Sequence, residues 1–389
     1  MAYTRSIFSH LLQWIPRLEF QKAVNAHQGD YRVRKLRTWS QFVALLFGQL
    51  TGHHSLRPIE AGMRSARQSF YHLGIDAEIH RSTLADANDR RDPDIYRDVF
   101  YQLLPKVQRA APKHRFRFHG VLEAVDSTTI SLCLELSPWA RFHHGKGAVK
   151  LHTALDLAGN LPTVAVLTDA RTHDVTVAKT LSFAPGTLLI VDKAYIDFAW
   201  FWELTQQGVG VVTRLKTNAV YTVVEHRDVP DRNRTQGVRS DQIIRMRSPR
   251  GMRYEGKLRR ISFRDPQTGH YLVFLTNRMD LSAKTICDLY KARWQIELFF
   301  KALKQNLQVK KFLGTSVKAV ATQIWIALIA YLLMTLLKFQ SKLGWGIPAI
   351  MAALTVALFS CRSLASLWND APKERCSKLA LGQLSFSFS

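Results

Sequence analysis

Residues 290–304 read YKARWQIELFFKALK, and their polar groups gather on one side of a helix. At 100° per residue, the side chains of Tyr290, Arg293, Glu297 and Lys304 fall within an arc of about 60°. An amphipathic helix ordinarily turns its charges to water, but this carboxylate borders an apolar stripe beside a phenol and two cations. Such a row suits a carboxylate that binds a divalent metal while its neighbours bind phosphates. The stripe consists of Leu289, Ile296, Phe300, Leu303 and Leu307.

The residues before this segment mark the start of the helix. Ser282 is placed to act as the N-cap, and Leu281 and Ile286 have the spacing of a hydrophobic staple. We therefore expect one helix that begins after Ser282 and runs on through Lys304.

Upstream of this helix the sequence changes to strands. Residues 121–130 read VLEAVDSTTI, a β-rich run whose apolar part ends at Asp126. Residues 150–157 and 161–168 are two more strands around a Gly-Asn turn. Because glycine and asparagine tolerate the positive φ of a tight turn, these two strands predict a β-hairpin.

Two shorter strands follow, each after a helix. Residues 187–192 (TLLIVD) and 209–214 (VGVVTR) are apolar runs, and helical spacing covers 174–183 and 197–207. The order is therefore three strands, a helix, a strand, a helix and a strand. This order predicts an α/β fold with a mixed sheet, in which helical crossovers add the later strands to an initial meander.

Acidic residues stand where two of these strands lose their apolar character. Asp126 and Asp192 each follow an apolar run, where side chains of open α/β sheets point into a shared crevice. One such aspartate alone is more often a turn or cap residue. Two on neighbouring strands, with Glu297 on a helix that follows the sheet, favour a functional site. Hard oxygen ligands without cysteine suit two Mg²⁺ or Mn²⁺ ions rather than zinc, and such a pair can cleave phosphodiesters.

We divide the chain into three units. Residues 1–115 have helical spacing and interleave aromatic residues with cations, which indicates a helical N-terminal DNA-binding domain. Residues 116–340 form the catalytic domain, within which the basic, turn-rich segment 215–278 is a β-rich insertion. Residues 341–389 are a helical C-terminal appendage. The helices expected in the first unit are 6–14, 40–50, 56–69 and 95–110.

The chain is strongly basic. Its 389 residues include 54 Lys and Arg against 30 Asp and Glu, which gives a net charge of +24 and a pI near 10.2. Such an excess indicates a polyanionic partner, most simply double-stranded DNA, with anionic lipid as the rival. Four widely spaced cysteines indicate reduced thiols in the cytoplasm and argue against a zinc site. The first twenty residues lack the pattern of a signal peptide.

One segment is long enough to cross a bilayer. Residues 317–337 read VKAVATQIWIALIAYLLMTLL. The polar side chains of Thr322, Gln323 and Thr335 and the lack of a comparable second span favour a buried core helix. We therefore expect no membrane partner.

Three motifs of this chain resemble those of a known family. They are VDSTT at 125–129, VDKAY at 191–195 and the spacing Y-x2-R-x3-E-x6-K over 290–304. They resemble the DDE transposases of bacterial insertion sequences, in the subgroup named after insertion sequence four. The resemblance covers the chain through about residue 340. The Y-R-E-K spacing matches in full and is specific, whereas the aspartate motifs alone are weak.

The resemblance implies a ribonuclease H-like core with Asp126, Asp192 and Glu297 as the catalytic, metal-binding triad for two Mg²⁺ or Mn²⁺ ions. It implies a transposase that binds the inverted-repeat ends of its element, nicks them with water and joins the 3′-hydroxyls to target DNA. A homodimer would work in the synaptic complex, in the bacterial cytoplasm and on the nucleoid when bound. The alternative is a transposase-derived DNA-binding protein without catalysis, against which the intact acidic and Y-R-E-K residues argue.

Several cations are candidate contacts to DNA phosphates. The resemblance assigns Tyr290, Arg293 and Lys304 to phosphates at the transposon end. Lys150 and Arg214 lie at strand ends near the expected site, which makes them further candidates.

The adjacent residues His173 and Asp174 resemble a dyad for base catalysis. The simpler interpretation is that Asp174 is the N-cap of the next helix.

The chain departs from the family pattern in two places. Residues 193–195 read KAY where many relatives have Arg-Gly-Tyr, a change that leaves metal binding alone. The insertion also has no tryptophan between residues 202 and 294, whereas some relatives use one to stack on a flipped base during hairpin formation. Tyr221 and Tyr254 are the candidate replacements.

Overall fold

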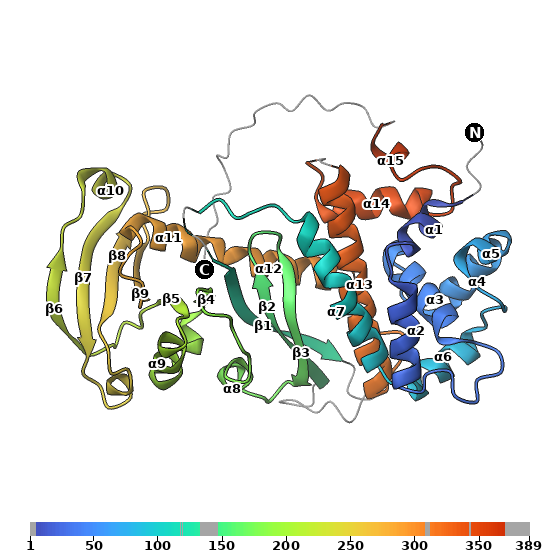
Figure 1. Cartoon of the computed structure of the whole chain (residues 1–389), viewed down its shortest axis with the longest axis horizontal. Coiled ribbons are helices and arrows are strands. Elements are labelled where there is room, and N and C mark those ends of the chain that lie inside the picture. The colour runs from blue at the N-terminus through green and yellow to red at the C-terminus, as the bar shows by residue number, and fades with distance from the viewer. Residues whose placement is uncertain are drawn as a thin grey trace.

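The computed structural model describes residues 5–116, 118, 120–132, 147–307, 312–341 and 344–369. Its centre is a nine-stranded sheet with the order β3-β2-β1-β4-β5-β9-β8-β7-β6 (Figure 1). The strands are β1 (Leu122–Leu132), β2 (Gly147–Asp156), β3 (Leu161–Asp169), β4 (Leu188–Val191), β5 (Gly210–Arg214), β6 (Tyr221–Arg227), β7 (Val238–Met246), β8 (Leu258–Arg264) and β9 (Tyr271–Thr276).

The first five strands form a mixed sheet. β1 pairs antiparallel with β2, and β2 pairs antiparallel with β3. β4 then joins β1 in parallel, and β5 joins β4 in parallel. The β2–β3 turn contains Asn160 at φ 54°, the left-handed conformation that the Gly-Asn pair predicted. The expected mixed sheet of an α/β fold is confirmed.

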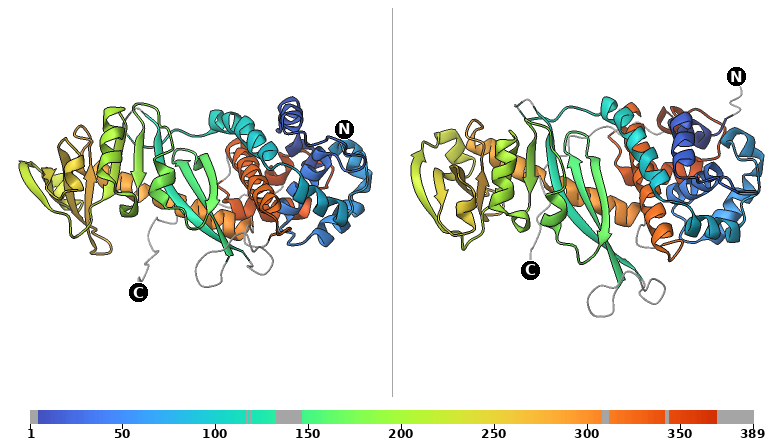
Figure 2. Two further views of the ribbon diagram at one scale, coloured as in Figure 1. Left: turned by 90° about the horizontal axis from the view of Figure 1, so that it is seen from below. Right: turned by 60° about the horizontal axis from the view of Figure 1, so that its bottom comes forward.

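Helices cover both faces of this core. Side chains alternate along β4, so Leu189 and Val191 pack with α9 on one face, while Leu188 and Ile190 pack with α11 on the other. α8 lies against β1 and β2 on the α9 side, and α12 lies against β1. Figures 1 and 2 show α11 and α12 running across the sheet towards the N-terminal helices. The bounds are α8 (Asp174–Ala178), α9 (Phe198–Gln206), α11 (Ala283–Ala292) and α12 (Trp294–Lys301).

The β-rich insertion extends the core sheet. β9 pairs antiparallel with the core strand β5, and β8, β7 and β6 continue outwards from it. β8 was not expected, because its sequence LRRISFR places two arginines next to each other. Arg259 is nevertheless only 2% exposed, since Asp241 on β7 pairs with it. The short helices of the insertion are α10 (Asp231–Thr235) and η4 (Gly251–Arg253), whereas η3 (Lys193–Tyr195) lies in the core just before α9.

The N-terminal region is helical, as predicted, and holds more helices than the spacing indicated. α2 and α6 are polar enough on their outer sides that their short apolar faces did not stand out. The helices are α1 (Ile7–Leu12), α2 (Arg17–Ala26), α3 (Thr38–Thr51), α4 (Leu56–Ser65), η1 (Arg67–Ser69), α5 (Phe70–Leu73), α6 (Arg81–Arg90) and α7 (Asp94–Ala110).

The long apolar segment is a core helix, α13 (Val317–Ser341). It is long and apolar enough to cross a membrane, but 94% of its most apolar 18-residue stretch is buried inside the protein. It packs against α7 and α3, and the ring of Trp325 is tilted against that of Phe100, with 5.6 Å between the ring centres. The preference for a buried helix is confirmed. The N-terminal helices therefore share one hydrophobic core with α12 and α13 (Figure 1).

The start of the helix that carries the polar row follows the sequence closely. The Oγ atom of Ser282 accepts a hydrogen bond from the amide of Thr285 at 3.1 Å and caps α11. Leu281 and Ile286 are both buried in the same cluster, as a hydrophobic staple requires. The N-cap prediction is confirmed.

The expected single helix is interrupted twice. The amide of Arg293 bonds to the carbonyl of Tyr290 at 3.1 Å, which tightens the turn between α11 and α12. After α12 the chain widens into a π turn, η5 (Ala302–Asn306), closed by the Leu307 amide. Since a π turn holds more residues than an α turn, the 100° spacing that aligned Lys304 with the row does not apply there.

The C-terminal appendage contains α14 (Ile347–Ala357) and α15 (Ser366–Asn369), and residues 370–389 lie outside the described part. α14 packs against α3 and α13. Cys287 is a buried free thiol and Cys361 an exposed one, while the other two cysteines of the sequence are not among the described residues.

Candidate active site

Asp126 lies on β1, on the sheet face that α12 covers. Its side chain is 22% exposed, and the backbone N–H of Ser127 donates to its Oδ1 atom at 2.8 Å. Burial raises the pKa of Asp126 to about 6, while the Ser127 N–H and the Arg293 guanidinium act in the opposite direction. This carboxylate therefore depends on nearby positive charge to stay ionised.

Asp192 lies beside it because β1 and β4 are parallel neighbours. Val125 of β1 pairs with Val191 of β4. The residue that follows each valine is one of the two aspartates, Asp126 or Asp192. Asp192 also caps the short helix η3, where its Oδ1 atom accepts from the amide of Ala194 at 3.1 Å. The sequence correctly placed the two aspartates side by side, but only Asp192 follows the end of its strand, because β1 continues past Asp126 to Leu132.

Two predicted phosphate contacts surround Asp192. The hydroxyl of Tyr290 donates to its Oδ2 atom at 3.4 Å, and Nη2 of Arg214 lies 3.7 Å from the same oxygen. The Tyr290 ring packs on Phe274 of β9 and has the guanidinium groups of Arg214 and Arg293 each 5.8 Å from its centre. Burial raises the pKa of Tyr290, so its hydroxyl stays protonated and can donate.

Arg293 joins the helix to the strand. Its Nη1 atom donates to Oδ2 of Asp126 at 3.0 Å, and its Nη2 atom donates to Oε1 of Glu297 at 2.5 Å. The side chain is only 14% exposed. The negative charges of Asp192 and Glu297 both act on the Asp126 carboxyl. Two of the three predicted acids, Asp126 and Glu297, therefore share one guanidinium, and strand pairing places Asp192 next to Asp126.

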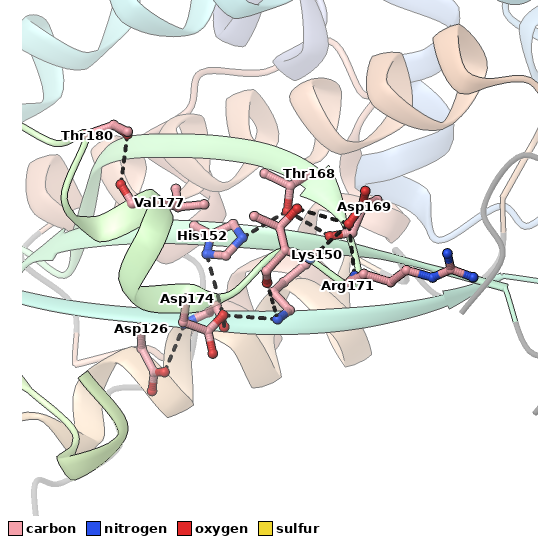
Figure 3. Close-up of polar contacts among 11 residues, drawn as sticks. Asp126, Lys150, His152, Thr168, Asp169, Arg171, Asp174, Val177 and Thr180 are labelled. Carbon is pink, nitrogen blue, oxygen red and sulfur yellow. Dashed lines mark hydrogen bonds and ion pairs between the residues drawn. The ribbon is translucent and has the colours of Figure 1, made fainter. Parts of the chain in front are cut away.

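Lys304 and Lys150 lie apart from this group. Lys304 is half-buried on the π turn. The ammonium of Lys150, on β2, donates to the carbonyl of Thr172 at 2.9 Å and lies 3.1 Å from Oδ1 of Asp174 (Figure 3). Its side chain is 14% exposed. Lys150 thus has two protein partners where the sequence predicted a DNA phosphate.

Asp174 does not cap the next helix. The N-cap of α8 is His173, and Asp174 is the first helical residue. Its Oδ1 atom accepts from Oγ of Ser127 at 2.7 Å and faces Lys150 and His152, as Figure 3 shows for the last two. The capping interpretation was wrong, because the position of β1 and β2 under this carboxylate is not visible in the local sequence.

The two insertion tyrosines differ in exposure. Tyr254 is 4% exposed, and its hydroxyl is 3.1 Å from the hydroxyl of Thr205. Tyr221 borders an open cavity of about 680 Å³ that is also lined by Arg214 and Arg260. The Arg260 guanidinium lies 5.4 Å from the centre of the Tyr221 ring. Only Tyr221 of this pair is placed to meet a nucleobase.

Comparison with known proteins bears on this group of acids. Residues 120–333, more than half of the chain, match the transposase DDE domain family. Protein y4zB of Sinorhizobium fredii, named as a transposase, is 30% identical over 315 residues, which cover 78% of this chain and 85% of that protein.

The chain belongs to the DDE transposase family. Two further relatives of this transposase are named for their insertion sequences. The IS5377 protein of Geobacillus stearothermophilus is 31% identical over 68% of each chain. InsG of IS4 from Escherichia coli is 26% identical over 47% of this transposase and 42% of InsG. The subgroup indicated by the Y-R-E-K spacing is thereby confirmed.

Two other matches complete the comparison. Residues 4–76 of the transposase match a domain of unknown function (DUF4372). Among solved structures, a piggyBac transposase synaptic complex with hairpin DNA aligns with 94% of this chain and 82% of that chain, at a TM-score of 0.45 and 11% identity.

The DDE family uses divalent metal, and the donor set of the transposase suits it. Within the described ranges, no three His, Cys, Asp or Glu side chains form a group close enough to share an ion. Arg293 instead lies between Asp126 and Glu297. The three acids nevertheless supply hard oxygen donors with no thiol or imidazole among them, which is the chemistry that Mg²⁺ and Mn²⁺ prefer.

The sequence indicated Asp174 only as a helix cap or half of a dyad, and it did not predict the polar cluster on the opposite face of the sheet from Asp126. Ser127, His152 and Asp174 gather on the α8 face of the sheet, directly behind Asp126. The hairpin register carried the signal: Ser127 pairs with His152 and Thr129 with Lys150, so these four side chains share one face.

Proposed function

We propose that this transposase binds the inverted-repeat ends of its own element, nicks each end with water and joins the freed 3′-hydroxyls to target DNA. The observation that carries the proposal is that Arg293 joins Asp126 to Glu297, while the parallel pairing of β1 and β4 places Asp192 next to Asp126. A DNA-binding protein that had lost catalysis would have no need of three converging acids in a partly buried place.

Asp126, Asp192 and Glu297 would hold the metal ions. Two Mg²⁺ or Mn²⁺ ions bound there would activate a water or a 3′-hydroxyl and stabilise the leaving 3′-oxygen. The chain's own contribution is orientation. The Ser127 and Ala194 amides fix one oxygen of each aspartate, and Arg293 holds Glu297 towards the strand edge.

The cations of the site would act on the DNA backbone. Arg214 and Tyr290 flank Asp192 and border the insertion, so a phosphate that enters there meets a guanidinium and a phenol hydroxyl. We propose Lys304, on the π turn that follows α12, as a further phosphate contact. Arg293 would reach a phosphate only by exchanging one of its carboxylate partners for it.

We propose residues 1–115 as the DNA-binding domain, with the loop of residues 31–35 as its main contact. Arg91, 7% exposed, anchors the base of the loop. It donates to the carbonyls of Gly29, at 3.0 Å, and Leu36, and to the side chain of Gln41 at 2.7 Å. An anchored loop loses little conformational entropy when it binds, which favours affinity.

The anchored loop presents its charges to an open groove of about 730 Å³. Arg32, Arg34 and Lys35 are exposed along it, and Arg90 of α6 and Lys318 of α13 continue the basic lining. The acidic side chains of Asp86 and Asp92 also line the groove, together with His27. Five cations around one groove suit the phosphates of a DNA duplex.

The remaining units and the assembly follow from the same proposal. Residues 116–340 would be the catalytic domain with the 215–278 insertion, and 341–389 an appendage. We propose a homodimer that brings two ends together in the bacterial cytoplasm, on the nucleoid when bound. Light scattering of the complex with end DNA should give the mass of two chains and two duplexes, and a single chain on a single duplex would contradict the dimer.

The test of the proposed reaction is Glu297→Gln. This change keeps the shape of the side chain but removes a charge from the metal site, so nicking and strand transfer on a labelled inverted-repeat duplex should collapse in Mg²⁺ or Mn²⁺. Asp126→Asn and Asp192→Asn should behave alike, and combining them should add little because one site is lost in each. Gel-shift binding of the same duplex should persist. Wild-type nicking by Glu297→Gln would falsify the assignment.

A further inference from the structure

Asp174 stands out as a carboxylate that the proposed reaction does not use. It lies on the face of the sheet opposite Asp126, and its hydrogen-bond and ion-pair partners among the described residues all contact one oxygen, Oδ1. They are the hydroxyl of Ser127 at 2.7 Å, the ammonium of Lys150 at 3.1 Å and Nδ1 of His152 at 3.7 Å. Figure 3 shows Lys150 and His152 pointing from β2 towards it.

Ser127 links this carboxylate to the catalytic one. Successive residues of a strand point to opposite faces, so Asp126 faces α12 while Ser127 faces α8. The backbone N–H of Ser127 donates to Oδ1 of Asp126 at 2.8 Å, and its hydroxyl donates to Asp174. One residue therefore holds both carboxylates, and a shift of Ser127 moves the hydrogen bond that fixes Asp126.

The far side of Asp174 is anchored firmly. Lys150 is held by the carbonyl of Thr172 at 2.9 Å, inside the loop that leads to α8. His152 is 3% exposed, and its Nε2 atom is 2.9 Å from the hydroxyl of Thr168 on β3. Burial lowers the pKa of His152 to about 4, so the cation beside Asp174 at neutral pH is Lys150.

We propose that Asp174 is a positioning residue that sets the Asp126 carboxylate for metal binding, acting through Ser127, with Lys150 as its counter-charge. This proposal rests on the proposed function, since it requires Asp126 to be a metal ligand. It also moves Lys150 from the DNA contacts to the support of the metal site. Partners of this kind behind a ligand commonly change metal affinity or activity by about 10–100-fold when they are removed.

A purely structural role makes a different prediction. If Asp174 only fastens α8 to the sheet, its loss should lower the melting temperature and leave the metal demand of the folded protein unchanged. Metal affinity of the folded, full-length chain is therefore the deciding measurement. It is read without DNA, from the EPR signal of free Mn²⁺ during titration, and again as the Mg²⁺ concentration for half-maximal nicking.

Single and double variants test each contact between Asp174, Ser127 and Asp126. Asp174→Ala and Ser127→Ala should each weaken Mn²⁺ binding about 10-fold or more, and their combination should add little because they break one contact. Ser127→Thr keeps the hydroxyl and should restore near-wild-type affinity. The matched control is Asp169→Asn, a carboxylate at the end of β3 whose side-chain partners among the described residues are Arg171 and Thr172.

Lys150→Met distinguishes support from DNA contact. It should weaken Mn²⁺ binding while leaving the salt dependence of end binding unchanged. A phosphate contact would instead reduce the slope of log affinity against log salt by about 0.9 and spare the metal. That result would overturn the role given to Lys150.

The remaining outcomes are also decisive. Wild-type Mn²⁺ affinity in Asp174→Ala and Ser127→Ala, measured in samples shown to be folded by circular dichroism, would overturn the positioning role. If Glu297→Gln also bound Mn²⁺ like the wild type, the proposed function itself would fail. If only Glu297→Gln lost the metal, the triad would stand and the role of Asp174 would be rejected.

Discussion

Nη1 of Arg293 lies 3.0 Å from Oδ2 of Asp126, although 167 residues separate them in the chain. The same guanidinium holds Glu297, four residues further along the helix. A cation that the sequence placed among phosphate contacts therefore balances two of the three carboxylates proposed to be catalytic. Divalent metal and Arg293 would compete for the same oxygens, which makes the charge of this site the first property to test.

Arg293→Ala should lower the free energy of unfolding by about 1–2 kcal/mol, since it removes two charged hydrogen bonds in a partly exposed place. Mn²⁺ should recover much of this loss, because the ion supplies the missing positive charge. Urea denaturation with and without Mn²⁺ measures both effects. Arg97→Ala is the control, since its pairs with Asp94 and Asp98 are more exposed and should respond little to metal. An Arg293→Ala protein that metal does not stabilise would argue against the shared oxygens.

The basic loop predicts a change in salt dependence. The triple substitution of Arg32, Arg34 and Lys35 by Ala should weaken binding of end DNA, and the slope of log affinity against log salt should become less steep by about 0.9 per lost phosphate contact. Fluorescence anisotropy between 50 and 200 mM salt, where the wild type should lose roughly 10³-fold in affinity, gives both slopes. Arg64 and Arg67, exposed cations outside the groove, are the matched pair. An equal effect of both sets would show general charge instead of a binding loop.

Tyr221 predicts a defect confined to strand opening. If its ring stacks on an unpaired base, Tyr221→Ala should cost about 1–3 kcal/mol per stacked base in a hairpin or strand-opening step while sparing the first nick. A denaturing gel of the products formed from an end-labelled duplex distinguishes the first nick from the hairpin or strand-opening step. Tyr254→Phe removes only a buried hydroxyl and should leave the products unchanged. The stacking role is excluded if Tyr221→Ala yields the wild-type set of products.

The insertion depends on a buried ion pair. Arg259 and Asp241 are 2% and 4% exposed, and Arg259 also donates to the carbonyl of Leu281 at the start of α11. Arg259→Leu should cost about 3–5 kcal/mol in urea denaturation, because it leaves a buried carboxylate without a partner. Adding Asp241→Asn should recover part of that loss. Arg278→Ala, which breaks an exposed pair with Asp280, should cost less than about 1 kcal/mol. Equal losses in the single and double variants would contradict this account.

Local signals in the sequence predicted much of the fold and the acids of the site. The alternation and the Gly-Asn turn predicted the hairpin, and Ser282 predicted the start of α11. Apolar runs followed by aspartate predicted that Asp126 and Asp192 would meet, and the parallel pairing of β1 and β4 places them side by side, although Asp126 lies within β1 and not at its end. Each of these inferences depends on residues close together in the chain. The division into three units is untested and stays a prediction.

Only the tertiary structure decided which partner each charged or aromatic side chain has. The sequence predicted that Arg293 and Lys150 would both contact DNA phosphates. Helix packing places Arg293 against Asp126 instead, and strand register places Lys150 against Asp174. Tertiary packing also buries Tyr254. It buries the apolar side chains of α13 in a core that this helix shares with the N-terminal helices. The physical reason is that spacing along one element determines which face a side chain occupies, whereas its partner lies on another element. The folding of the whole chain brings that partner into place.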